Sequence, residues 1–435
     1  MQFTIVTFGC QMNERDSRAL ANILVNQGYN EVSDPSKADI LIINTCTVRQ
    51  HAEDRAISNL GRFLKDKKHQ IIGLMGCVAE RRKEELIKRF DKLDFVVGPS
   101  KFEEIPRIID DIIKNRSDGV VLYGESEPHP AKWGITEAIK GISSWVTIMT
   151  GCDNYCSYCI VPYVRGRMRS LKEDIIYKEL ENLQEAGYKE ATLLGQNVNA
   201  YGRDLNGNRN FTDLLIKIDK EKYLKRIRFV SSHPAFVDDY FIDNVTALQT
   251  ICPHYHLPLQ SGDNSVLFNM NRKYTIESFF EKVEKLRKKR PNCSITSDLI
   301  VGLPTEDDKS FSRTLEFIKR IRFDSMHTFA YSKREATAAY KFGDTIPFNI
   351  KKQRLKEVNK LQQQISLEIN NSLIGKIVEV LIEGPSPKNK NEYQGRTETN
   401  KIVIVKSEKN ITGEIVDVMI ERAGSYTLFG KRDFF

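Results

Sequence analysis

Residues 151–159 read Gly-Cys-Asp-Asn-Tyr-Cys-Ser-Tyr-Cys and place Cys152, Cys156 and Cys159 in one short loop, directly after the strand-like run 146–150. Three thiolates in a tight loop can hold a soft metal centre. A cubane iron-sulfur cluster needs four ligands, so three cysteines leave one iron open to a small substrate. The loop therefore indicates a reactive metal site at the start of a strand-and-helix series.

A structural zinc site, completed by a fourth side chain from elsewhere, is the alternative for the same loop. The spacing of three and then two residues lacks the paired Cys-x-x-Cys knuckles of a zinc ribbon, and no other Cys or His lies within the loop. Both features favour an iron-sulfur cluster, but the sequence alone leaves zinc open.

Strand-like runs recur after this loop, with helical patterns such as 171–186 and 274–290 between them. A repeated strand-helix unit of this kind predicts parallel strands that curve into an incomplete barrel, here a partial (β/α)6 barrel. The runs are 146–150, 191–194, 227–230, 254–257, 295–301 and 325–329.

The first part of the chain also alternates apolar runs with amphipathic stretches, which predicts an open parallel sheet of the Rossmann or flavodoxin-like kind. Its first three runs end in Cys10, Cys46 and Cys77. Because the carboxyl ends of parallel strands share one edge, we expect these cysteines to converge there. A cysteine that ends a buried strand is often only a small core residue, but three at equivalent ends favour a ligand set.

The end of the chain predicts a small antiparallel β-barrel, because short β-type runs at 375–383, 395–396, 402–405 and 415–419 are separated by Gly, Pro and Asn. A polar stretch, 114–140, is expected to be a linker. The expected domains are residues 1–120, 138–368 and 371–435.

Composition limits the class of protein. The 435 residues exceed one hydrophobic core, and the 40% apolar and 29% charged content is ordinary for a globular protein. The start lacks the pattern of a signal peptide and no apolar run reaches membrane-spanning length, so a cytoplasmic location without a membrane is expected, with the eight cysteines reduced. A net charge of +8 permits a nucleic-acid partner without demonstrating one.

A basic run, Arg165, Arg167, Arg169 and Lys172, follows the cysteine loop and is the candidate for contact with RNA phosphates. A solvated surface is the other interpretation of such a run. Cys252 and Cys293 show no grouping with other cysteines and are expected to be packing residues.

At this point the residues resemble a known family. The cysteine loop, with Tyr158 before its last cysteine, resembles the radical S-adenosylmethionine signature, and residues 7–13, Thr-Phe-Gly-Cys-Gln-Met-Asn, resemble the methylthiotransferases. The resemblance covers essentially the whole chain and is closest to the branch that acts on N6-isopentenyladenosine in tRNA. It also rests on residues 160–167, 194–202 and 256–262, and on residues 384–386 and 395–398, which resemble the RNA-binding TRAM barrel.

The resemblance implies two 4Fe-4S clusters, one on Cys152, Cys156 and Cys159 and an auxiliary one on the early cysteines. The first would chelate S-adenosylmethionine at its open iron and release a 5′-deoxyadenosyl radical, and the second would carry the sulfur that is methylated and inserted at C2 of adenosine 37. Family topology implies S-adenosylmethionine contacts at Gly195, Gln196, Ser231, Ser232 and Gly302, although residues of these types after strands also simply make turns. The resemblance to the TRAM barrel also implies that Arg396 contacts RNA.

The implied partners are tRNA carrying isopentenyladenosine and an electron donor such as flavodoxin; the sulfur donor is left open, and a monomer is expected. Two rivals remain. A sibling methylthiotransferase would act on threonylcarbamoyl-adenosine in tRNA or on a ribosomal-protein aspartate, but tends to carry Lys at Gln11. A zinc-bearing, non-catalytic RNA-binding protein is the rival of another class. One departure from the family pattern is Ala336, where a glycine is common.

Overall fold

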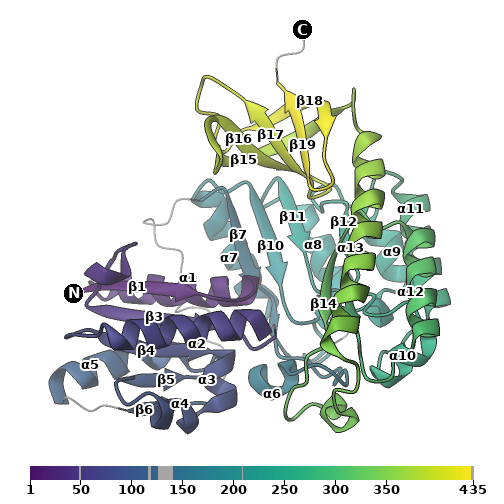
Figure 1. Cartoon of the computed structure of the whole chain (residues 1–435). Helices are drawn as coiled ribbons and strands as arrows, with labels where there is room; N and C mark the ends of the chain where they lie inside the picture. The colour runs from purple at the N-terminus through teal and green to yellow at the C-terminus, as the bar shows by residue number, and fades with distance from the viewer. Residues whose placement is uncertain (49, 116–118, 126–140, 208, 433–435) are drawn as a thin grey trace.

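The computed structural model describes the chain except for residues 49, 116–118, 126–140, 208 and 433–435, and most of the expected linker lies outside the described residues. Three units follow one another along the chain (Figure 1). The N-terminal unit, drawn in purple and blue, flanks the central unit, and a small barrel, drawn in yellow, lies over one end of the central strands. Within the described part, no helix is both long and apolar enough to cross a bilayer.

The N-terminal unit is built on a six-stranded parallel sheet in the order β2-β1-β3-β4-β5-β6, which confirms the predicted open sheet. Strands β3 and β4 are buried along their whole length because helices and apolar side chains cover both faces. The strands are β1 (Gln2–Thr7), β2 (Asn30–Glu31), β3 (Ile40–Thr45), β4 (Ile71–Gly76), β5 (Phe95–Val97) and β6 (Val120–Leu122). The α-helices are α1 (Gln11–Asn26), α2 (Gln50–Lys65), α3 (Cys77–Arg82), α4 (Glu84–Arg89) and α5 (Ile105–Asn115).

The central unit has parallel strands in two arcs, β11-β10-β7 and β12-β13-β14, which a bridge between Ile227 and Ile251 connects. This arrangement confirms the incomplete barrel. The strands are β7 (Ser143–Thr147), β10 (Glu190–Leu194), β11 (Arg226–Phe229), β12 (His254–His256), β13 (Ser294–Val301) and β14 (Ser325–Ala330), and a short pair, β8 (Met149–Thr150) with β9 (Arg169–Ser170), frames the cysteine loop. The α-helices are α6 (Val161–Arg165), α7 (Glu173–Glu185), α8 (Phe211–Glu221), α9 (Asp239–Val245), α10 (Asn264–Asn269), α11 (Ile276–Lys289) and α12 (Asp308–Ile321).

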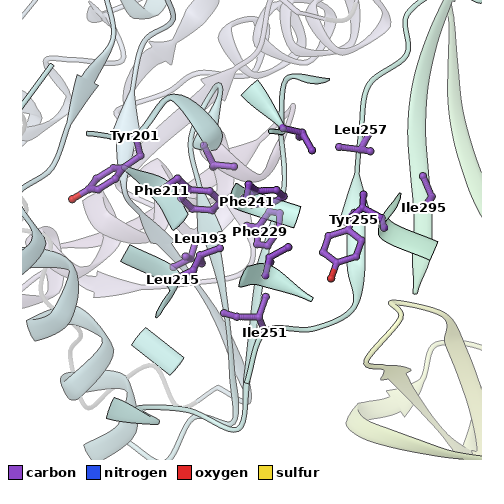
Figure 2. Packing of buried hydrophobic residues seen from close by; sticks show 14 of the residues in the cluster. Leu193, Tyr201, Phe211, Leu215, Phe229, Phe241, Ile251, Tyr255, Leu257 and Ile295 are labelled. Atoms are coloured by element: carbon purple, nitrogen blue, oxygen red, sulfur yellow. The ribbon is translucent and has the colours of Figure 1, made fainter. Parts of the chain in front are cut away.

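An aromatic cluster lies between the strands and the outer helices of this unit (Figure 2). The ring of Phe211 on α8 meets that of Phe229 on β11 edge-on, with centroids 5.2 Å apart, and Phe241 on α9 meets Phe229 at 5.9 Å. Edge-to-face pairs of this kind add to the stabilisation from burial. The cluster fixes α8 and α9 on the strands. Packing in this unit therefore does not depend on the strand ends, which can carry polar groups.

The C-terminal unit is a closed barrel in the order β15-β16-β17-β19-β18. The predicted small barrel is confirmed. Its pairs are antiparallel except β17 with β19, which are parallel. Helix α13 (Phe348–Asn371) packs along β14 and leads into the barrel. The strands are β15 (Ile377–Ser386), β16 (Asn389–Thr397), β17 (Ile402–Lys406), β18 (Ile415–Ala423) and β19 (Thr427–Lys431), and β19 was not among the expected runs.

Two arginines on β11 hold this barrel on the central unit. Arg226, fully buried, donates to the carbonyl of Arg396 at 2.8 Å and pairs with Glu379 at 2.7 Å. Arg228 donates to the carbonyls of Thr397 and Glu398 at 2.6 Å each. Guanidinium groups of the central unit thus supply hydrogen bonds to backbone carbonyls of the barrel.

Replacing Arg226 with methionine should lower the free energy of unfolding by about 2 kcal/mol, because the charge-assisted hydrogen bonds from this buried guanidinium to the barrel are lost. Urea-induced unfolding followed by circular dichroism measures this. The matched control is Lys431→Met, whose half-exposed ion pair with Glu421 should change stability by less than about 0.5 kcal/mol. Equal effects from the two variants would contradict the assigned role of Arg226.

Candidate active site

The three early cysteines lie at one edge of the N-terminal sheet, as the parallel topology requires. Cys10 follows β1, Cys46 follows β3 and Cys77 begins α3 after β4, and these three strands are neighbours. Gly9, at φ +141°, permits the approach, because a Cβ at this position would lie 2.4 Å from the Cβ of Cys46. The backbone before Cys10 therefore packs directly on Cys46.

The thiols of this edge interact with one another. A hydrogen bond with the Cys46 side chain lowers the pKa of Cys10 to about 6, with a further contribution from the positive charge of Arg165. The same hydrogen bond raises the pKa of Cys46, and burial raises that of Cys77. Because the thiolate is the form that binds metals, the edge offers one ready ligand and two that lose protons on binding.

Two buried asparagines fix the loop that carries Cys10. Asn13 donates from Nδ2 to Oδ1 of Asn44 at 3.2 Å, and Asn44 donates to the carbonyl of Asn13 at 2.8 Å. The thiol of Cys10 donates to Oδ1 of Asn13 at 3.6 Å. Both amides are fully buried, so these bonds tie the end of β1 to the end of β3.

The loop of the second triplet is held from both sides. The amide of Cys152 donates to the carbonyl of Gly166 at 3.2 Å, and Nδ2 of Asn271 donates to the carbonyl of Tyr155 at 2.9 Å. Arg272, which is buried, donates from one guanidinium nitrogen to Sγ of Cys156 at 3.4 Å. The segment between α10 and α11 therefore positions the cysteine loop.

Burial dominates the acid-base behaviour of this triplet. It raises the pKa of Cys152 to about 11 and that of Cys159 to about 12, and the nearby charge of Arg272 opposes both shifts. The two groups are thiols at neutral pH in the apo chain, and binding of a soft metal centre would release their protons.

Zinc and a cluster would place different demands on the spacing of the thiolates. In the described residues, no group of three His, Cys, Asp or Glu side chains is close enough to hold one metal ion. Tetrahedral zinc would draw thiolates to about 3.8 Å from one another, because each Zn–S bond is about 2.3 Å long. A cubane, whose ligands bind different irons, spaces its thiolates more widely. The cluster ligands stay a prediction.

The two triplets are adjacent. Cys77 forms one buried cluster with Ile160, the residue after Cys159, and with Val164 of α6. Helix α6 thus lies between the cysteine loop and the edge of the N-terminal sheet, and α3 contacts α6. Helix α6 therefore contributes to both cysteine sites, although the sites lie far apart in the sequence.

The basic run after the loop divides into buried and exposed members. The side chain of Arg165 is 7% exposed and pairs with Asp16, so this guanidinium does not face a surface that phosphates reach. Arg167 is 73% exposed beside Asp153, and Lys172 is exposed, so both fit an RNA surface. Arg169 pairs with Glu125.

In the C-terminal barrel, Arg396 pairs with Glu383 at 3.0 Å and stays partly exposed.

Polar groups gather at the carboxyl ends of the central strands. Oε1 of Gln196 and Oγ of Ser232, both expected from the sequence, are buried and lack a hydrogen-bond partner among the described residues. Ser231 lies in the left-handed region at φ +68°. Gln260 shares both properties, with φ +66° and an orphaned Oε1, and sequence reasoning missed it. Buried polar atoms without partners and strained backbone both point to a ligand site.

Side chains pack closely against Gly195 and Gly302, the two glycines predicted to contact S-adenosylmethionine. A Cβ on Gly195 would lie 2.5 Å from Cγ of Met149, so Gly195 allows this side chain to pack closely, and its contact with S-adenosylmethionine stays a prediction. Gly302, at φ +77°, donates a hydrogen bond from its backbone N–H to Oε1 of Glu306 at 2.8 Å, and the methylene chain of Lys351 packs against it.

A cavity of about 160 Å³ opens beside Cys152 and is lined also by Met149, Met168, Asn197, Arg203 and Phe236.

The loop after β14 reaches the N-terminal unit. Arg334 donates to Oε1 of Gln50 at 2.7 Å.

Ala336, where the family commonly has glycine, adopts φ +68°, which L-residues avoid. We expect Ala336→Gly to raise the free energy of unfolding by about 0.5–1 kcal/mol, measured by urea unfolding, because glycine relieves this strain at a small entropic cost. Unchanged or lower stability would show that the loop has relaxed the strain.

Comparison with protein families divides the chain in the same order as the structure. Residues 2–98 match a family described as uncharacterized protein family UPF0004. Residues 146–318 match the radical SAM superfamily, and residues 371–431 match the TRAM domain.

Curated relatives match along the full length. The chain is 42% identical over 440 residues to the tRNA-2-methylthio-N(6)-dimethylallyladenosine synthase of Syntrophomonas wolfei, covering 99% of this chain and 97% of the relative. It is 44% identical to the protein of the same name from Thermodesulfovibrio yellowstonii, covering 98% and 97%. Among solved structures, the radical S-adenosylmethionine methyltransferase TsrM of Kitasatospora setae aligns with a TM-score of 0.58 at 12% identity, covering 89% of this chain and 79% of that one. This last likeness concerns the fold.

Proposed function

Because this chain belongs to the family of the tRNA-2-methylthio-N(6)-dimethylallyladenosine synthases, which are radical S-adenosylmethionine enzymes, we propose that it converts N6-isopentenyladenosine at position 37 of tRNA to its 2-methylthio derivative. Full-length identity of about 40%, together with two adjacent cysteine triplets, carries the proposal. The triplets matter most, because attaching sulfur at an unactivated C–H bond needs a cofactor.

The residues present fit two 4Fe-4S clusters, one on each triplet. Cys152, Cys156 and Cys159 lie in a loop that Arg272 and Asn271 hold in place, and three ligands leave one iron open. When bound, the clusters and S-adenosylmethionine supply the radical chemistry, the methyl group and the sulfur that replace hydrogen at C2 of the adenine.

The strand ends fit the polar groups of S-adenosylmethionine. Gln196, Ser232 and Gln260 offer buried oxygen atoms, which have no hydrogen-bond partner in the described part of the chain, to a ligand that carries amino and hydroxyl groups. The chain's own contribution is to bind and orient, since the reacting groups must be held close together and away from water. Buried Tyr274, which donates to the carbonyl of Leu259 at 2.7 Å, holds the strand end before Gln260 in place.

The C-terminal barrel and exposed basic residues supply the proposed RNA surface. A TRAM domain and relatives named for a tRNA product support tRNA as partner. Arg167 and Lys172 lie beside the cysteine loop and are exposed, so they are placed to meet phosphates next to the target base. We extend the proposal to a monomer in the cytoplasm that receives electrons from a flavodoxin-like donor, while the sulfur donor stays open.

The deciding experiment is anaerobic reconstitution with iron and sulfide, followed by reaction with S-adenosylmethionine, dithionite and isopentenylated tRNA. Mass spectrometry of the nucleosides should show the mass of one added methylthio group on isopentenyladenosine. Absence of this product from fully reconstituted protein rejects the substrate. A gain on threonylcarbamoyl-adenosine would assign the chain to a sibling activity, and purified protein with zinc but no iron or sulfide would reject the cluster chemistry.

A further inference from the structure

Arg165 carries a positive charge from the central unit into the cysteine edge of the N-terminal sheet. It ends α6, which follows the loop of the second triplet, and its side chain is 7% exposed. One guanidinium nitrogen donates to Oδ2 of Asp16 at 2.7 Å and to Oδ1 of Asn13 at 3.1 Å. Both acceptors belong to α1, the helix that begins directly after Cys10.

Three observations place this charge at the first triplet. Oδ1 of Asn13 accepts from both Arg165 and the thiol of Cys10, the latter at 3.6 Å. Cys77 packs on Val164, the residue before Arg165. Helix α6, which ends at Arg165, also contacts α3, the helix that begins at Cys77.

The burial of the Arg165 guanidinium has an energetic cost that other interactions must offset. Taking a guanidinium out of water is costly unless it is paired, and Asp16 supplies one partner. Three thiolates add negative charge to a cluster, and each electron that the cluster accepts adds one more. A fixed cation at the edge therefore favours the thiolate form of the ligands and the reduced form of the cluster.

We propose that Arg165 is a positioning residue of the auxiliary site: its buried guanidinium, paired with Asp16 across the boundary between the two units, balances the charge of the cluster on Cys10, Cys46 and Cys77 and sets its reduction potential. The inference rests on the proposed function, since it needs a cluster on this triplet. The auxiliary site is then a composite of two units, and the helix after one cysteine loop forms part of the other site.

Simple attachment of the two units is the competing role, and the chain offers a matched control for it. Arg15, on the same helix α1, pairs with Glu179 of α7 at 2.6 Å and is also largely buried. This ion pair joins α1 to α7 and so crosses the same boundary between the two units. Loss of attachment alone would therefore affect Arg15 and Arg165 variants alike.

The test uses the full chain with Cys152, Cys156 and Cys159 replaced by alanine, so that the first triplet alone can hold a cluster. Into this parent are placed Arg165→Met, Arg165→Lys, Asp16→Asn and Arg15→Met. Iron and sulfide contents are measured after anaerobic reconstitution, and the midpoint potential is measured by titration with electron paramagnetic resonance detection. These readouts do not depend on turnover.

Substitutions at Arg165 and at Asp16 are expected to shift the midpoint potential of the cluster in opposite directions. Arg165→Met should lower the ratio of reduced to oxidised cluster at fixed potential by at least about tenfold, which corresponds to about 59 mV for one electron. Asp16→Asn should raise the potential, because it removes a negative charge and keeps the guanidinium. Arg165→Lys should stay nearer the parent than Arg165→Met, and Arg15→Met should leave the potential unchanged.

Several results would overturn the inference. Equal potentials in the parent and Arg165→Met would do so, as would shifts of the same sign in Arg165→Met and Asp16→Asn, or an equal shift in Arg15→Met. If Arg165→Met holds no iron, the sign of the Asp16→Asn shift decides, and an unchanged or lower potential overturns the inference. A parent without iron on the first triplet would instead reject the proposed function, and the inference with it.

Discussion

Replacing Cys156 with alanine is expected to remove one of the two clusters and to lower the rate of S-adenosylmethionine cleavage by at least about a thousandfold. Two cysteines cannot hold a cubane with a single open iron, so the position at which a small ligand binds is lost. Iron and sulfide per chain should fall by about half, because the first triplet is untouched. Chromatographic detection of 5′-deoxyadenosine measures the cleavage.

Two matched cysteine variants separate this effect from loss of a thiol in general. Cys293→Ala removes a thiol that is packed on the central core, and it should leave iron content and cleavage unchanged. Cys46→Ala should also lower the iron content by about half, yet retain S-adenosylmethionine cleavage while losing the methylthio product. Cleavage at the parent rate in Cys156→Ala would contradict the assignment of the second triplet.

The sequence alone predicted the place of the early cysteines because topology controls it. Parallel strands put their carboxyl ends at one edge, and β1, β3 and β4 are neighbours in the sheet. Gln196 and Ser232 were expected only because of the family resemblance. Gln260 escaped because nothing in its sequence context shows the left-handed backbone or the orphaned amide oxygen that single it out in three dimensions.

Arg165 shows where sequence reasoning ends. In the sequence it belongs to a basic run and looks like its neighbours Arg167 and Arg169. Only the packing of α6 on the N-terminal sheet turns this one guanidinium inward, toward Asp16, which is 149 residues away in the chain. Burial of a charge depends on such distant partners, and a local charge pattern does not encode them. The parallel seam between β17 and β19 was missed for a similar reason, since it depends on how the barrel closes.

A second buried charge, Glu53 on α2, joins the loop after β14 to the N-terminal unit. Its side chain is 1% exposed and accepts from Thr47 at 2.9 Å. Arg81 pairs with it, Arg82 lies at 3.2 Å, and Arg334 reaches it from the central unit at 3.3 Å. One carboxylate therefore serves several guanidinium groups. Their mutual repulsion would be uncompensated without it.

Glu53→Gln should lower the free energy of unfolding by about 3–5 kcal/mol, because removing one partner of a buried ion pair leaves the other charges buried and unbalanced. Glutamine keeps the shape of the side chain, so the loss reports charge rather than packing. Urea-induced unfolding followed by circular dichroism measures it. Glu85→Gln is the matched control: Glu85 also pairs with Arg82, at 3.6 Å, but is 61% exposed, and its loss should cost less than about 0.5 kcal/mol. A change below about 1 kcal/mol in Glu53→Gln would mean that the arginines find other partners.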